Sequence, residues 1–192
     1  NTRSACASTK VRVDLKKKWK TKIGGRLSSV VVAKGKLLVA SIDSQRLHCL
    51  DSESGGELWD FLAAGRIDSP PTICADMAIF GSCSGHVYAL RLSDGELVWR
   101  FRGAPDKRRT VVRDRLESLW PVHGSVLVVN SAVYFAAGRT SYIDGGIWVF
   151  ELDAESGLVP GFAISGPIDI EAGADTVTII DADGEKEAEI IR

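Results

Sequence analysis

Basic side chains gather between residues 103 and 119 and form a candidate anion or partner site. Residues 106–115 carry five basic residues against two Asp: Lys107, Arg108, Arg109, Arg113 and Arg115. Guanidinium groups bind carboxylates and phosphates through paired hydrogen bonds. The alternative is a solvated loop, or a loop that pairs with the acidic C-terminal residues. Because aromatic side chains do not alternate with these charges, no nucleic-acid partner is expected.

A second set of residues follows this segment and could surround a small polar ligand. It consists of Glu117, Trp120, His123, Arg139 and Asp144. If Trp120 and His123 begin a strand and Arg139 and Asp144 lie in a later loop, the set could meet at one mouth of a channel. The alternative is structural: Arg139 forms an ion pair with Asp144 or Glu117, and His123 is a hydrogen-bonded histidine of the fold.

Catalytic and metal-binding patterns are not recognisable. The sequence has no CxxC, no GxGxxG, no phosphate loop and no Ser–His–Asp set with local support. His48 and His86 each lack a second His nearby, and the acids of residues 181–185 lack the spacing of a calcium loop. We therefore expect neither a catalytic residue nor a bound metal.

The four cysteines are too few for a disulfide scaffold. We expect Cys49, Cys74 and Cys83 to be small core residues. If the protein is exported, one disulfide between Cys74 and Cys83 across a hairpin is the alternative. The redox state of Cys6 is not predicted.

The composition excludes several classes of protein. The chain has 192 residues, 45% of them hydrophobic and 26% charged, with a net charge of −1. These values exclude a disordered chain, a coiled coil and a uniformly basic nucleic-acid binder. Nineteen Gly and Val-rich runs between polar clusters indicate strands and turns. No apolar run is long enough to span a membrane.

Charge is distributed unevenly along the chain. Residues 1–26 hold nine Lys or Arg and one acid, whereas residues 151–192 hold eleven Asp or Glu and two basic residues. Opposite charges of this size would attract each other if the fold brought the two ends together.

A repeat of about 40 residues organises the chain. Trp19, Trp59 and Trp99 are separated by 40 and 40 residues. A third, degenerate copy around Gly157 lies 62 residues after Gly95, so it carries about 22 additional residues, which map to 103–124. Sheets that recur at this period are typical of a β-propeller.

Each repeat is predicted to form four short strands separated by Gly, Asp and Ser turns. The expected strands are 27–33, 37–41, 47–51 and 57–62; 71–75, 78–82, 86–91 and 96–102; and 122–129, 132–137, 146–152 and a weak fourth. The predicted fold is therefore all-β, a β-propeller of four-stranded antiparallel blades with three legible repeats and a divergent C-terminal segment.

These repeats resemble the PQQ-like, or quinoprotein-type, β-propeller repeat, whose hallmark is Ala-x-Asp-x-x-x-Gly-x-x-x-Trp. The resemblance covers about residues 16–160. The first copy has Cys49 in place of Ala, the second has Arg91 in place of Asp, and the third lacks the Trp. The resemblance implies a blade-docking role for eight residues: Trp19, Asp51, Gly55, Trp59, Gly95, Trp99, Asp153 and Gly157.

Residues 116–128, 137–139 and 144–147 are similar to a planctomycete-type bacterial subfamily of unassigned function. Quinoprotein dehydrogenases of the superfamily bind PQQ and Ca²⁺ against a disulfide of adjacent cysteines, and this sequence has no adjacent cysteines. No cofactor is therefore expected. The resemblance implies a non-catalytic protein-interaction scaffold or ligand-sensing module, periplasmic or otherwise extracytoplasmic. The alternatives are a PQQ-binding oxidoreductase, or part of one, and a purely structural fragment.

The sequence does not determine the number of blades or whether the ring closes. At 40 residues each, 192 residues allow at most four or five blades. Residues 1–192 are interpreted as one propeller domain or a fragment, with 103–119 as an insertion loop and 161–192 as a divergent last blade or tail. A basic strand at 11–20 could pair with the acidic segment, which holds a predicted hairpin of 176–181 and 185–191. The expected partners are another protein, further blades, or a second copy of the chain.

Overall fold

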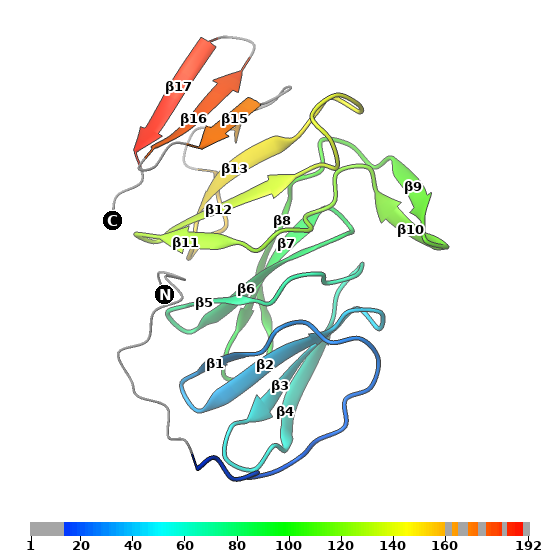
Figure 1. Ribbon diagram of the computed structural model, residues 1–192, viewed down its shortest axis with the longest axis vertical. Helices are drawn as coiled ribbons and strands as arrows, with labels where there is room; N and C mark the ends of the chain where they lie inside the picture. Colours follow the sequence, from blue (N-terminus) through cyan, green and yellow to red (C-terminus); the bar gives the residue numbers. More distant parts are fainter. Residues whose placement is uncertain (1–13, 160–162, 165–168, 173–175, 182–183, 190–192) are drawn as a thin grey trace.

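The fold is all-β, as the sequence predicts. The computed structural model describes residues 14–159, 163–164, 169–172, 176–181 and 184–189, with side chains described for residues 14–159 (Figure 1). Strands and turns account for all the regular structure of these residues. Accordingly, the described part holds no helix of the length and apolar character that crossing a membrane requires.

Three four-stranded antiparallel sheets follow one another along the chain, each with its strands in sequence order. They stack face to face in Figure 1, as the blades of a propeller do. The first sheet contains β1 (Val31–Ala33), β2 (Lys36–Ser41), β3 (Arg46–Asp51) and β4 (Glu57–Leu62). The second contains β5 (Thr72–Cys74), β6 (Met77–Ser82), β7 (His86–Arg91) and β8 (Leu97–Arg102). The third contains β11 (Leu127–Val129), β12 (Ala132–Ala137), β13 (Trp148–Asp153) and β14 (Ala163–Ile164).

Two smaller sheets complete the described structure. The insertion, predicted as a loop, forms a hairpin of β9 (Arg109–Val112) and β10 (Arg115–Ser118) that projects from one edge of the stack (Figure 1). The C-terminal residues form a sheet of β15 (Asp169–Ala172), β16 (Thr176–Asp181) and β17 (Gly184–Glu189). Whether this sheet acts as a divergent last blade stays a prediction.

Two predicted strands are much shorter in the structure than the sequence indicates. Strand 27–33 is reduced to β1, and Leu27 makes only a single bridge to Ser41. Strand 122–129 is reduced to β11, because Val122 donates to the Ser82 carbonyl while the Pro121 carbonyl accepts from Gly138. This segment therefore bridges two sheets instead of lying in one.

The predicted N-terminal strand is also not observed. Its residues 11–13 lie outside the described residues, and residues 14–24 form no strand. They run along the end of the first sheet (dark blue in Figure 1), where Trp19 packs against Gly55. Side-chain contacts hold this segment against the first sheet. Its backbone therefore does not need to pair as a strand. Ring closure through residues 11–20 stays a prediction.

The core lies between the sheets, and alternation along the middle strands divides it into two clusters. Phe80 and Tyr88 contact the first sheet, whereas Ile79 and Val87 contact the third. All four are at most 2% exposed. Successive side chains of a strand point to opposite faces, so the central residues of β6 and β7 are apolar on both faces because both faces of the second sheet are covered.

The three repeat tryptophans make the same hydrogen bond to the following sheet. Each indole Nε1–H donates to a backbone carbonyl: Trp19 to Ser52 at 3.0 Å, Trp59 to Leu92 at 3.1 Å and Trp99 to Ala154 at 2.8 Å. The acceptor lies three residues before the repeat glycine in every case. The third pair spans 22 more residues than the others, which matches the inserted segment.

The repeat glycines lie directly beneath these indole rings. A Cβ atom built on Gly55, Gly95 or Gly157 would stand 2.5–2.6 Å from the ring of the preceding Trp. All three also have positive φ angles, of 74°, 77° and 67°. Only glycine satisfies both conditions without strain. The ring therefore packs directly on the turn of the next sheet.

The turn that holds each glycine is stabilised by its first residue. The Asp51 carboxylate accepts from the backbone N–H groups of Glu53 and Ser54, and Asp153 accepts from the N–H of Ser156. These bonds lower the pKa of both carboxyls, with the Ser side-chain hydroxyl as the largest contribution. Arg91 replaces Asp in the second copy, and the turn keeps its backbone bond from Gly95 to the Arg91 carbonyl.

Replacing Gly95 with Ala should destabilise the fold more than replacing Gly35. Both glycines have similar positive φ angles, of 77° and 73°, but a Cβ at Gly35 meets nothing within 4 Å. We expect Gly35→Ala to lower the free energy of unfolding by about 1 kcal/mol from backbone strain alone. Gly95→Ala should lower it by about 3 kcal/mol, because it also displaces Trp59. Urea unfolding measures both, and equal losses would contradict the packing role of Gly95.

Candidate functional site

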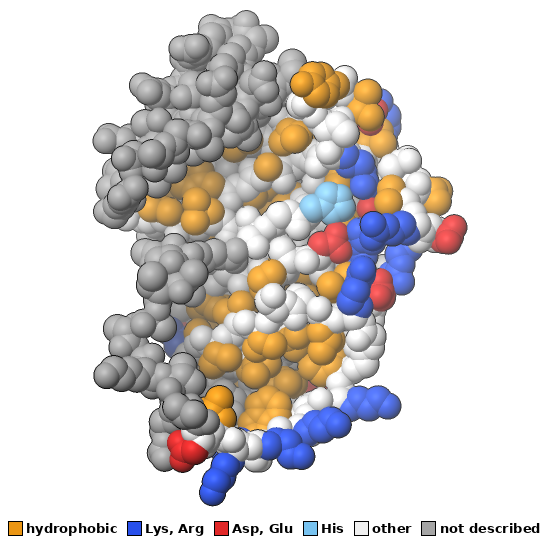
Figure 2. Space-filling view, viewed as in Figure 1, with side chains coloured by type: hydrophobic (Ala, Val, Ile, Leu, Met, Phe, Trp, Pro, Cys, Tyr) orange, Lys and Arg blue, Asp and Glu red, His pale blue; other side chains and the backbone are white. Residues whose placement is uncertain are grey.

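Six charged, imidazole or thiol side chains converge where strands of different sheets end. We call them the charged cluster: Arg66, Asp68, Cys83, Glu117, His123 and Arg139. They come from the connection after β4, the turn after β6, the end of β10, the segment that follows it, and the loop after β12. Figure 2 shows Lys, Arg, Asp, Glu and a histidine gathered along the edge of the molecule from which the β9–β10 hairpin projects. We call this edge the hairpin face.

Glu117 lies between two guanidinium groups. Its carboxylate is 3.3 Å from Arg66 Nη2 and accepts a 2.7 Å hydrogen bond from Arg139 Nη2. Arg139 also donates to the Ser118 carbonyl at 3.1 Å. Glu117 is only 3% exposed. A carboxylate buried this deeply needs cationic partners to offset its lost hydration, so the two arginines anchor β10 to the second and third sheets.

Asp68 is the most heavily hydrogen-bonded acid of the cluster. It lies 2.9 Å from Arg66 Nε and accepts from Arg66 Nη2 at 3.0 Å and from Cys83 Sγ at 3.2 Å. His123 Nδ1 is 2.8 Å away. Burial alone would raise the pKa of Asp68, but the bonds from His123 and Cys83 and the Arg66 charge hold it well below its usual range. Asp68 is therefore ionised at neutral pH.

Cys83 is held as a neutral thiol. Burial raises its pKa to about 12, and its bond to the Asp68 carboxylate acts in the same direction. The thiolate is the nucleophilic form of cysteine, so Cys83 donates a hydrogen bond and is unreactive at neutral pH.

The alternative of a Cys74–Cys83 disulfide is wrong. Cys49, Cys74 and Cys83 are all free thiols. Cys74 pairs with Met77 at the start of β6, whereas Cys83 follows the end of that six-residue strand. At about 3.3 Å per residue, the two cysteines lie at opposite ends of the hairpin, beyond the reach of a disulfide.

Asp68, Cys83 and His123 are also the one group of described residues whose donor atoms lie close enough together for a metal, within 4.8 Å of one another. Their chemistry favours a hydrogen-bonded cluster. Arg66 already neutralises the carboxylate, the thiol is protonated, and Arg139 Nη1 lies 3.4 Å from His123 Nε2. A metal cation would be placed beside two fixed guanidinium charges.

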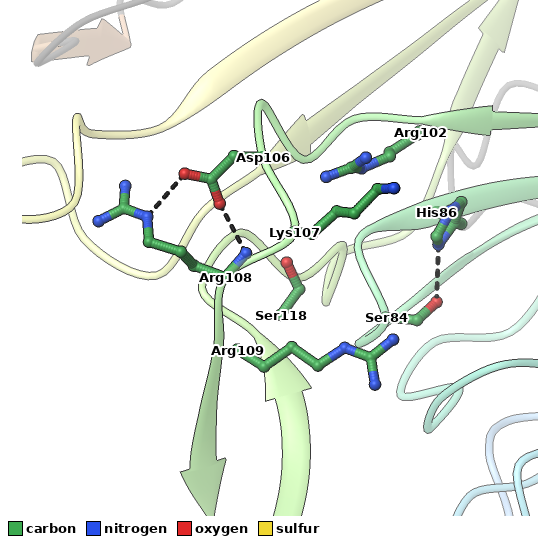
Figure 3. Close-up of a pocket in the computed structure, with 8 residues that line it drawn as sticks. All are labelled: Ser84, His86, Arg102, Asp106, Lys107, Arg108, Arg109 and Ser118. Carbon is green, nitrogen blue, oxygen red and sulfur yellow. Dashed lines mark hydrogen bonds and ion pairs between the residues drawn. The ribbon is translucent and has the colours of Figure 1, made fainter.

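Next to the charged cluster, a basic pocket of about 320 Å³ opens between the second sheet and the hairpin (Figure 3). Its basic side chains are Arg102, Lys107 and Arg109, and Ser84, His86 and Ser118 complete its lining with Asp106 and Arg108. Arg108 turns to the far side of Asp106 and bonds to it at 2.6 Å. Burial, together with the charges of Arg100 and Arg102, lowers the pKa of His86.

An aromatic pocket of about 620 Å³ adjoins the basic pocket and shares Asp106 and Arg108 with it. Trp120, Trp148, Pro105, Asp144 and Gly145 line the rest. The Arg108 guanidinium lies 4.9 Å from the centroid of the Trp120 ring, a cation–π contact. The indole Nε1 atoms of Trp120 and Trp148 are buried and have no hydrogen-bond partner among the described residues.

The residues singled out from the sequence separate into three places. Glu117, His123 and Arg139 meet in the charged cluster, whose Arg139–Glu117 pair is one of the two ion pairs anticipated. Trp120 and Asp144 lie in the aromatic pocket, and Lys107, Arg108 and Arg109 line the basic pocket. The residue outside all three is Arg113, which occupies the turn between β9 and β10.

Trp120 and His123 do not begin a strand as expected, because Pro121 and Val122 bridge two sheets. Sequence reasoning also missed Arg66, Asp68 and Cys83. The available signal was the pair Arg66 and Asp68, two charges two residues apart in a stretch of small and apolar residues directly after an outer strand.

Comparison with known proteins relates the chain to a family. The family model PQQ_2, described as outer membrane protein assembly factor BamB, matches residues 11–159. The outer membrane protein assembly factor BamB of Shewanella oneidensis is 31% identical over 77 residues, which are 40% of this chain and 19% of that protein. The chain therefore spans about a fifth of the length of this curated relative.

Solved structures share the fold. The crystal structure of BamB from Moraxella catarrhalis superposes with a TM-score of 0.58 and 21% identity, over 90% of this chain and 48% of that one. A quinohemoprotein alcohol dehydrogenase from Pseudomonas putida HK5 gives a TM-score of 0.60 and 17% identity, over 72% of this chain and 20% of that one.

Acid should weaken the fold through Asp68. Its pKa is lowered in the folded state, so the unfolded chain binds the proton more tightly, and stability falls as the pH drops below the unfolded value of about 4. We expect the free energy of unfolding to decrease less steeply between about pH 4 and pH 2 in Asp68→Asn than in the unmodified chain. Asp76→Asn, at an exposed position, is the control and should keep the original slope. Urea titrations at each pH measure this, and parallel slopes for Asp68→Asn and the unmodified chain would contradict the prediction.

Proposed function

The chain belongs to the PQQ_2 family of the outer membrane protein assembly factor BamB, and on this basis we propose that it is a non-catalytic β-propeller module that binds other proteins. The match over residues 11–159, which include all three tryptophan contacts, carries this proposal. The relatives of known name are assembly factors for outer membrane proteins. Because the chain spans about a fifth of their length, the identity of its partner is part of the proposal.

The chemistry of the charged cluster supports a binding role over a catalytic one. Asp68 is ionised and bound by Arg66 and Cys83, Cys83 is a neutral thiol, and Glu117 is buried between two arginines. A general acid or base needs a pKa near the working pH, and a nucleophile must be activated. The cluster instead fixes the hairpin, so that the rim residues of 103–119 are presented to a partner.

The alternative is a quinoprotein-type oxidoreductase, and the described residues do not fit the Ca²⁺ ion that such an enzyme binds with PQQ. Ca²⁺ takes six to eight oxygen ligands, whereas the cluster of suitable geometry offers one carboxylate, one thiol and one imidazole. Its carboxylate is already bound by Arg66. The likeness to the quinohemoprotein dehydrogenase is one of fold.

The proposal places the chain outside the cytoplasm of a bacterium, in the compartment where outer membrane proteins are assembled. The names of its relatives support this placement. Membership of a planctomycete-type subfamily stays a prediction, as does pairing with a second copy. Ligand sensing at the basic and aromatic pockets would be a more specific form of the proposed binding role.

PQQ and Ca²⁺ should not bind stoichiometrically. We expect a titration of the chain with PQQ in the presence of Ca²⁺ to leave the absorbance spectrum of PQQ unchanged, and dye-linked oxidation of alcohols to stay at background. A PQQ dehydrogenase measured in parallel is the positive control. Saturable binding at one PQQ per chain would overturn the non-catalytic assignment.

A partner should be captured through the hairpin. We expect a photo-reactive phenylalanine analogue at Val111, an exposed residue of β9, to cross-link in the cell of origin to a component of outer membrane protein assembly, identified by mass spectrometry. Leu58, exposed on β4, is the matched control and should give little of that adduct. No adduct from Val111, or equal adducts from both positions, would contradict binding of an outer membrane assembly partner at the hairpin face.

A further inference from the structure

The basic pocket and the aromatic pocket adjoin, and we propose that together they bind one extended peptide segment of a protein partner, with acidic side chains in the first pocket and aromatic or aliphatic side chains in the second. This inference rests on the proposed function and names the chemistry of the partner. The two pockets are neighbours on the hairpin face, because Asp106 and Arg108 line both of them.

Positive charge in the basic pocket is not balanced by the described residues. Arg102, Lys107 and Arg109 line the pocket, and none has a carboxylate within salt-bridge distance in the described part of the chain. The one acid there, Asp106, is bonded by Arg108 and by the Arg108 backbone N–H. Arg102 Nη2 is buried without a hydrogen-bond partner. A carboxylate group would supply both the missing charge and the missing acceptors.

Two of the residues that line the aromatic pocket, Trp120 and Trp148, have indole donors with which no described residue pairs. The Nε1–H groups of Trp120 and Trp148 are buried, and neither has an acceptor among the described residues. A buried donor without an acceptor is unfavourable, and a ligand that supplies one is correspondingly favoured. Backbone carbonyls of a peptide are suitable acceptors, while the Trp rings and Pro105 provide apolar surface for its side chains.

An extended peptide meets these requirements better than a small anion. Inorganic phosphate would satisfy the basic pocket but would leave the indole donors and the apolar surface of the adjacent pocket unused. The hairpin also suits an extended backbone, because β9 begins at Arg109 and, among the described residues, pairs only with β10. A strand with an unpaired edge can accept a peptide through main-chain hydrogen bonds.

The experiment follows the indole N–H signals of the chain by NMR during titration with acetyl-Glu-Glu-Phe-Phe-amide. The sequence has five Trp, and Trp→Phe variants assign the signals of Trp120 and Trp148. We expect both signals to shift saturably. Binding of acetyl-Gln-Gln-Phe-Phe-amide and of acetyl-Glu-Glu-Ala-Ala-amide should be at least about tenfold weaker, since each lacks one of the two required features.

Variants at exposed positions test the charge requirement without disturbing the core. Lys107→Gln combined with Arg109→Gln should weaken the Glu-Glu-Phe-Phe peptide at least about tenfold. Arg113→Gln, which removes a charge from the hairpin turn outside both pockets, should leave the affinity for this peptide unchanged.

Trp148→Phe tests the aromatic pocket. It should weaken binding of the peptide and leave the response to inorganic phosphate unchanged.

Three outcomes would overturn the inference: no saturable shift with any peptide, equal binding of the Gln and Glu peptides, or inorganic phosphate binding as tightly as the Glu-Glu-Phe-Phe peptide. The last outcome would indicate a small-anion pocket. A partner that cross-links at Val111 while no peptide binds would leave the proposed function standing and reject the peptide groove. Failure of cross-linking with retained peptide binding would reject the assembly partner alone.

Discussion

Contact between each repeat tryptophan and the glycine turn of the next sheet is the constraint on which the propeller depends. A four-stranded sheet buries its faces only against neighbours, and the indole ring fixes how closely the next sheet can approach. The ring lies where a Cβ would otherwise be, and its N–H donates to a carbonyl three residues before the glycine. Trp19, Trp59 and Trp99 therefore place three successive sheets in equivalent positions, and the two apolar clusters form between them.

Because this contact sets the spacing of the sheets, the chain between two sheets is free to vary in length. The 22 additional residues between the second and third repeats leave the Trp99 hydrogen bond to Ala154 intact, at 2.8 Å. They contribute the β9–β10 hairpin and residues of both the basic pocket and the aromatic pocket. The side chains of the two pockets therefore come largely from the inserted segment, which also contributes Trp120 and Val122 to the core between the second and third sheets.

The charged cluster connects that segment to the propeller. Glu117 at the end of β10 is buried and paired with Arg66 and Arg139, which come from connections of the second and third sheets. Removing one member of such a buried set leaves an uncompensated charge. The cluster thus holds the hairpin at a defined angle and keeps the basic and aromatic pockets side by side, which a flexible loop could not do.

From the sequence alone, the period of the Trp and Gly residues determined the all-β propeller, the four-stranded blades and the position of the insertion, because these features are local and repeat. The pairing of Arg139 with Glu117 was one of two alternatives, and only the tertiary structure chose between them. Arg66 and Asp68 could not be assigned to a common site with Cys83, since the connection after β4 meets the turn after β6 only when the chain folds. The predicted strand at 122–129 was too long for the same reason. The hydrogen bonds of residues 121 and 122 go to two different sheets. A local sequence pattern cannot predict hydrogen-bond partners that are so distant in the chain.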